Sequence, residues 1–89
     1  MISQKVKIIN PSGLHLRPAG VFCEKAMEYK CSVTFGYRGG NTGNAKSVLS
    51  ILGACIRAGD EIEIRCDGID EEEAMQGLLE AVAEGFGEK

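Results

Sequence analysis

The feature that most constrains the fold is the change of hydrophobic period along the chain. In residues 60–66, DEIEIRC, apolar and charged residues alternate, which is typical of a strand with one buried face. Residues 5–9 and 31–37 alternate in the same way. The glycine-rich turn that follows 31–37 predicts a hairpin, with a short return strand at 41–45 that has no bulky apolar residue. Together these four segments predict a small sheet.

Three other segments carry apolar residues at helical spacing, namely residues 16–29, 47–56 and 70–86. Ser47 is suited to cap the second helix, and Asp70, with Glu73 three residues later, predicts a capping box at the third. The order is therefore β-α-β-β-α-β-α. It predicts an α+β open-faced β-sandwich, in which a four-stranded antiparallel sheet carries three helices on one face, within a single domain over residues 1–89.

The charge balance argues against several classes of protein. Ten basic and thirteen acidic residues give a formal net charge of −3, whereas a protein that binds the phosphates of nucleic acid needs an excess of Lys and Arg. No apolar run approaches the roughly 20 residues of a membrane span, and the first residues do not have the pattern of a signal peptide. We therefore expect a cytoplasmic protein with no nucleic-acid partner and no membrane contact.

The four cysteines form no metal-binding or redox motif. They are Cys23, Cys31, Cys55 and Cys66, and no pair has the C-x-x-C spacing that closes a zinc or redox site. A disulfide framework would require export, which nothing in the sequence signals. We expect four reduced thiols that act as small hydrophobic residues in the core, with no metal and no cofactor.

The most specific segment is PSGLHLRPAG, residues 11–20, which holds the only histidine of the chain. Pro18 is tolerated only in the first turn of a helix, so the helix must begin near residue 15 or 16. The amides of Leu16 and Arg17 then have no intrahelical partner, and with the helix dipole they form a site for an anion, usually phosphate. Arg17 adds a guanidinium group that can bind phosphate oxygens.

His15 lies at the mouth of this predicted anion site. The field of the helix N-terminus disfavours imidazolium, which keeps the ring neutral and nucleophilic. A neutral imidazole nitrogen can attack phosphorus and form a phosphoramidate that still transfers readily to a further acceptor. Because the neutral ring already has a free lone pair, no partner base is required, and a lone histidine is enough for a phosphoryl carrier. The alternative role for a single histidine is that of a surface residue or a helix cap with no part in chemistry.

At these residues the chain resembles the HPr family, the histidine-containing phosphocarriers of the bacterial sugar phosphotransferase system. GLHLRPAG (13–20) resembles the family's active-site loop, and NAKSVLSILG (44–53) resembles its second signature, over a match of about residues 3 to 86. The resemblance implies that enzyme I phosphorylates His15, with Arg17 beside it, from phosphoenolpyruvate. IIA components of sugar permeases then receive the group, so the protein is a carrier rather than a stand-alone enzyme. The other residues of the phosphate-binding loop are Ser12, Gly13, Leu16 and Pro18.

The second signature implies regulation at Ser47. In many Gram-positive relatives the ATP-dependent HPr kinase modifies this serine and turns the protein into a corepressor for a catabolite-control transcription factor. Ser47 can serve as a helix cap as well, and both roles can hold at once. Val48, Leu49 and Leu52 match the apolar patch that docks partner proteins, and their alternative role is in the core. We expect a monomer.

Several positions depart from the family pattern. Leu16 follows the histidine where alanine or threonine is usual, and Gly20 lies inside the first helix at a cost of up to about 1 kcal/mol. Gly43 stands where a β-former is usual, and Ser50 and Cys55 stand where glycine is common. The catalytic loop is intact, whereas the regulatory region is altered.

Two other classes of protein fit part of the pattern. An HPr-like regulatory module would bind transcription factors or enzymes without serving sugar uptake. Paralogues of that type can lack the histidine, whereas this chain keeps His15 with Arg17. A small metal chaperone has a similar element order but needs paired cysteines in its first loop, which contains none here. The choice among a sugar-type chain, a nitrogen-type chain and a dihydroxyacetone kinase stays open at this point.

Overall fold

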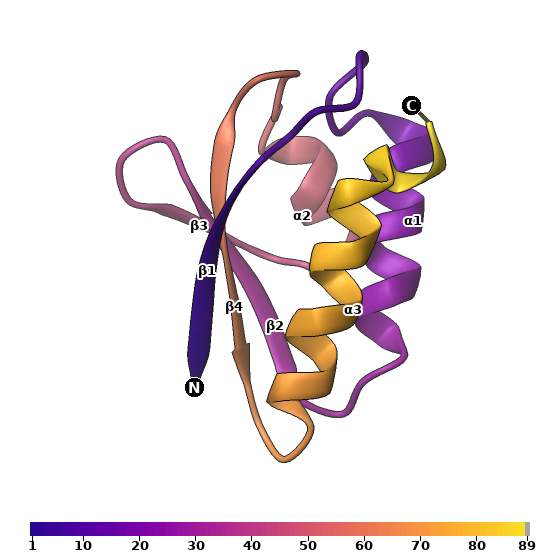
Figure 1. Cartoon of the computed structure of the whole chain (residues 1–89). Coiled ribbons are helices and arrows are strands. Elements are labelled where there is room, and N and C mark those ends of the chain that lie inside the picture. Colours follow the sequence, from indigo (N-terminus) through magenta and orange to yellow (C-terminus); the bar gives the residue numbers. More distant parts are fainter. Residues whose placement is uncertain (89) are drawn as a thin grey trace.

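The computed structural model of the chain describes residues 1–88. Its elements follow the predicted order (Figure 1): β1 (Ile2–Lys7), α1 (Leu16–Met27), β2 (Ser32–Tyr37), β3 (Asn41–Asn44), α2 (Val48–Gly53), β4 (Glu61–Asp67) and α3 (Glu71–Ala83). A short 3-10 turn at Gly85–Gly87 follows α3. Among these residues no helix has the length and apolar character needed to cross a membrane. The predicted α+β fold is confirmed.

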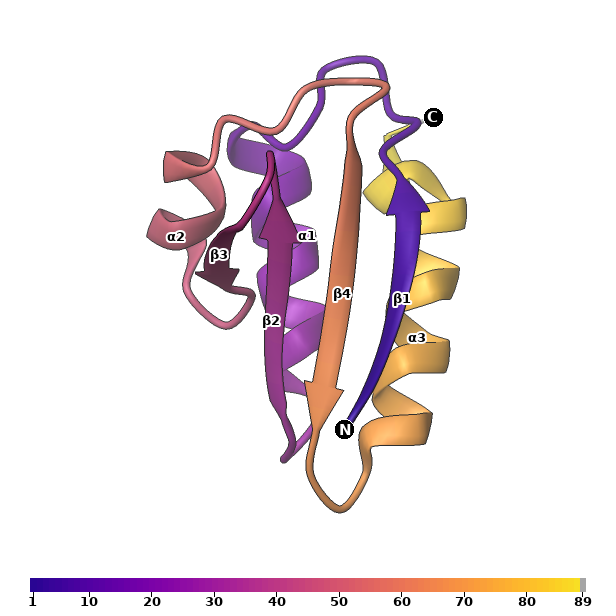
Figure 2. The same cartoon turned by 90° about the vertical axis from the view of Figure 1, so that its left-hand side faces the viewer.

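The sheet has the strand order β1-β4-β2-β3, and every neighbouring pair is antiparallel. Ile62, Ile64 and Cys66 of the central strand β4 are buried, as their alternation with charged residues predicts. Ile64 lies opposite Gln4 in β1 and Phe35 in β2. Figure 2 views the open face of the sheet, with α1 and α3 behind the strands. The period of two therefore determines which face is buried.

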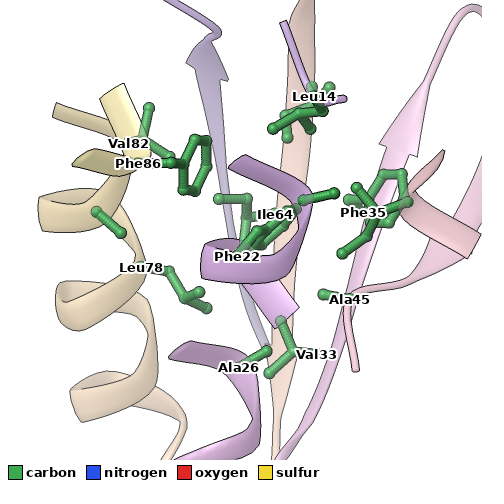
Figure 3. Packing of buried hydrophobic residues seen from close by; sticks show 14 of the residues in the cluster. Leu14, Phe22, Ala26, Val33, Phe35, Ala45, Ile64, Leu78, Val82 and Phe86 are labelled. Atoms are coloured by element: carbon green, nitrogen blue, oxygen red, sulfur yellow. The ribbon is translucent and has the colours of Figure 1, made fainter. Parts of the chain in front are cut away.

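The core lies between the sheet and the two longer helices, α1 and α3. Phe22 of α1 is fully buried, and its ring centroid lies 5.8 Å from that of Phe35 and 5.3 Å from that of Phe86. Leu78 and Val82 of α3 point toward the same cluster (Figure 3). Phe22 therefore packs α1 against both the sheet and the C-terminal turn. Burial of one such aromatic side chain contributes about 1.5–3 kcal/mol to stability.

Several ends of elements differ from the prediction. β1 stops at Lys7, and Ile9 is exposed rather than part of the strand. α1 stops at Met27, whose side chain is exposed and not on the buried face. α2 stops at Gly53, two residues before Cys55, which has a positive φ of 53° that no helix can continue. The elements therefore end where the backbone geometry cannot continue them or where an apolar side chain is exposed to solvent.

Gly43 in β3 is explained by packing. It pairs with Phe35 across β2 and β3, and a Cβ atom at position 43 would lie 2.4 Å from Cζ of the Phe35 ring. The glycine that weakens the strand therefore makes room for a fully buried aromatic side chain.

The predicted capping box at α3 is wrong. Asp70 does occupy the N-cap position, but its side chain makes no capping hydrogen bond. Its carboxylate instead accepts hydrogen bonds of 2.8 Å each from the amides of Lys30 and Cys31. The bond from Lys30 is the main cause that lowers the pKa of Asp70. A tertiary partner has thus replaced the local one.

The four cysteines are free, but they do not share one environment. Cys31 and Cys66 are buried, as predicted, and Cys23 is half-buried. Burial raises the pKa of the Cys66 thiol to about 12, so this group is neutral at cellular pH. Cys55 is exposed, so the expectation of four core thiols is wrong for this residue.

Candidate functional site

His15 occupies the N-cap position of α1, with an extended backbone of φ −89° and ψ −165°. Pro18 is buried in the first turn of the helix, where its fixed φ is compatible with helical geometry. The imidazole makes no capping hydrogen bond, and the His15 side chain is 51% exposed. Another macromolecule can therefore reach the ring.

The first turn of α1 provides hydrogen-bond donors next to this ring. The first amide bonded along the helix is that of Ala19, which donates to the His15 carbonyl at 2.8 Å. Because Pro18 has no N–H group, the amides left without a helical partner are those of Leu16 and Arg17. Arg17 is exposed, and within residues 1–88 its guanidinium forms no ion pair. The start of α1 thus combines free amides with a cation.

Gly13 shapes the loop that leads to His15. Its φ is +67°, and a Cβ atom there would lie 2.5 Å from the Ile56 carbonyl oxygen and 2.8 Å from Cα of Arg57. The next residue, Leu14, is buried and donates its amide to the Ile56 carbonyl at 2.9 Å. The loop is therefore held against the connection between α2 and β4, and only glycine allows this approach without strain.

A carboxylate that the sequence analysis did not identify lies against His15. Oε2 of Glu88 is 3.1 Å from Nε2 of His15, across 73 positions of sequence. Its other oxygen, Oε1, accepts a 3.2 Å hydrogen bond from Nδ2 of Asn10, which is fully buried. Hydrogen bonds, chiefly from Ser12, lower the pKa of the Glu88 carboxyl group to about 2. Figure 1 shows this C-terminal end of the chain beside the first turn of α1.

The ionised Glu88 determines where the His15 ring carries its proton. A carboxylate only accepts hydrogen bonds, so Nε2 is the donor in this contact. In the neutral ring the free lone pair is then on Nδ1, which makes Nδ1 the nitrogen available for attack. The sequence named no partner for His15, and the structure places Glu88 beside it. The only local hint of this role is an acidic residue in the glycine-rich segment 85–88.

The second predicted region lies at the start of α2. Ser47 is its N-cap, as predicted, and its Oγ accepts a 3.2 Å hydrogen bond from the Ser50 amide. Leu49 is 78% exposed, whereas Val48 and Leu52 are half-buried and pack against the core. Among the three predicted docking residues, Leu49 is thus the one whose side chain is open to a partner.

Comparison with known proteins decides the family. A family model described as the PTS HPr component phosphorylation site matches residues 2–84. The chain belongs to the HPr family. It is 43% identical over 81 residues to phosphocarrier protein HPr of Chlamydia muridarum, a match that covers 91% of this chain and 77% of the relative. The crystal structure of an HPr from Thermoanaerobacter tengcongensis has a TM-score of 0.94 at 30% identity, with 100% of this chain and 99% of that one covered.

The HPr fold also occurs in a regulatory relative. The crystal structure of Crh, a catabolite repression protein of Bacillus subtilis, has a TM-score of 0.75 at 32% identity and covers 94% of this HPr chain and 95% of Crh. That Crh is described as a domain-swapped dimer, and another Thermoanaerobacter tengcongensis HPr structure, with a TM-score of 0.77 at 31% identity, is also described as a dimer. These relatives conflict with the expectation of a monomer.

Proposed function

We propose that this HPr protein accepts a phosphoryl group on His15 from phosphorylated enzyme I and passes it to IIA components of sugar permeases. The observation that carries the proposal is the accessible imidazole at the N-cap of α1, beside the free amides of Leu16 and Arg17. A phosphoryl group in transfer carries negative charge on its oxygens, which such preorganised donors stabilise.

The transfer needs only one nucleophilic nitrogen. The lone pair on Nδ1 of His15 forms a bond to phosphorus, while the bond from phosphorus to the donor's imidazole nitrogen breaks and leaves its electron pair on that nitrogen. The two free amides and the Arg17 guanidinium bind the phosphoryl oxygens. Transfer onward to a IIA protein repeats the step with His15 as the leaving group, so the ring has to stay exposed on its Nδ1 side.

Incubation with phosphoenolpyruvate and enzyme I tests the proposal. The intact mass should rise by one phosphoryl group. The added mass should survive alkaline treatment and be lost in acid, as expected for phosphohistidine. His15→Ala should not gain the mass, although it should remain folded, because its ring is half exposed and caps no amide. A His15→Ala variant that is phosphorylated equally well would refute the assignment.

We also propose that HPr kinase modifies Ser47. A phosphate there adds up to about two negative charges beside the exposed Leu49, which would weaken the approach of enzyme I. The same charge would favour a basic surface on a catabolite-control transcription factor. The N-cap position supports this proposal, because the positive end of α2 can accept the phosphate with little change of fold.

The second candidate is a regulatory HPr-like module that does not serve sugar uptake, acting in catabolite control or in a nitrogen-type chain. The similarity to Crh favours this candidate. The same phosphorylation assay separates the two functions. A chain that enzyme I leaves unmodified, but that HPr kinase modifies at Ser47, is the regulatory module.

A further inference from the structure

The contact between Glu88 and His15 depends first on the turn that follows α3. Gly85, Phe86 and Gly87 all have positive φ, at 63°, 52° and 80°. This conformation is unfavourable for Phe86, but its side chain is only 3% exposed and its ring packs on Phe22 of α1. Buried packing thus holds the turn, and the turn directs Glu88 toward the start of α1.

The buried Asn10 binds Oε1 of Glu88, the oxygen that does not contact His15. Nδ2 of the fully buried Asn10 donates both to Oε1 of Glu88 and to the Gly13 carbonyl. Both partners are acceptors, so the amide has to present its nitrogen to them. The Glu88 side chain is only 22% exposed, against 51% for His15. The carboxylate is therefore positioned by buried groups and partly shielded from water, which strengthens its effect on nearby charge.

We infer that Glu88 is a positioning residue for phosphoryl transfer: its carboxylate holds the Nε2 proton of His15 and stabilises the positive charge that the ring gains. The inference rests on the proposed function. When the lone pair of Nδ1 becomes the bond to phosphorus, the ring keeps its Nε2 proton and becomes an imidazolium. A carboxylate bonded to the other ring nitrogen stabilises that cation, as in the carboxylate–histidine pair of serine hydrolases. The protonated ring is then also the better leaving group toward the next acceptor.

The first test compares variants that separate charge from shape. Glu88→Gln removes the charge. Asn10 and His15 bond to different oxygens of Glu88, so the single amide oxygen of glutamine can accept from only one of them. Single-turnover phosphorylation by saturating phosphorylated enzyme I should slow about tenfold, with the half-saturating concentration unchanged. Glu88→Asp should recover part of the rate. Glu84→Gln is the matched control, because it makes the same charge change at an exposed residue of the same segment and should transfer at the wild-type rate.

The second test reads the His15 ring without any phosphorylation. Nitrogen-15 NMR of the wild type should show a protonated Nε2 and an unprotonated Nδ1. The Nε2 proton should exchange with water more slowly in the wild type than in Glu88→Ala. The inference is overturned if the wild type lacks this protected proton, or if Glu88→Gln is phosphorylated as fast as the wild type or faster. If the wild type itself is not phosphorylated, the proposed function has failed, and the inference fails with it.

Discussion

Replacing Gly13 by alanine tests whether the loop before His15 has to approach the protein backbone closely. Two penalties are expected, and both follow from the structure. The φ of +67° costs about 1–2 kcal/mol for an L-residue. The added Cβ would also lie 2.5 Å from the Ile56 carbonyl oxygen and 2.8 Å from Cα of Arg57, and such overpacking costs about 1–3 kcal/mol. Their sum, about 2–5 kcal/mol, is a large part of the stability of a small domain.

Urea denaturation followed by circular dichroism measures this loss. The matched control is Gly20→Ala in α1. Apart from its chain neighbours and the nearby helix backbone, no described atom lies within 4 Å of the added Cβ, so helix propensity alone should stabilise the protein by up to about 1 kcal/mol. Where Gly13→Ala is still folded, its phosphorylation by enzyme I should be slower than that of the wild type. The loop has to move away from Ile56 and Arg57 to accommodate the Cβ atom, and this movement displaces His15. A Gly13→Ala variant within about 0.5 kcal/mol of the wild type would refute the reasoning, because neither penalty would then act on the loop.

Four further substitutions, at three positions, test the ends of the helices. Ser47→Ala should lower the free energy of unfolding by about 1 kcal/mol without slowing phosphorylation at His15. Ser47→Asp should slow phosphorylation at His15 with little change in the thermal midpoint. If protein phosphorylated at Ser47 accepts the phosphoryl group from enzyme I as fast as the unmodified protein, Ser47 has no regulatory role. Cys55→Gly should stabilise the protein by up to about 1 kcal/mol in urea, because φ is 53° at this exposed residue; no gain would mean that the backbone is unstrained there. The pKa of Asp70 is lowered from an ordinary 3.8, so its contribution is complete above that pH and is lost as pH falls through the folded value. Asp70→Asn should therefore destabilise the protein at neutral pH and not in strong acid, and a difference independent of pH would contradict this.

Much of the fold follows from the sequence because its signals are local. The alternation in residues 60–66 identifies the buried face of β4, since side chains of a strand point to opposite faces in turn. Pro18 places the start of α1 within a residue of where it lies, because proline is tolerated only in the first turn of a helix. Ser47 caps α2 through a bond to an amide three residues away. Each of these features is decided by neighbours within one turn or one strand.

The remaining features were decided only by tertiary structure. Asp70 has the sequence of a helix cap, but its carboxylate accepts from the amides of Lys30 and Cys31, just before β2, which only the folded chain brings to it. Gly43 weakens a strand in isolation and is required by the Phe35 ring beside it. The pattern of residues 11–20 identifies His15 but carries no information about residue 88, so it predicts no partner for the ring. The burial of Phe86 against Phe22 turns the C-terminal segment back to α1, and that long-range packing brings Glu88 to the histidine.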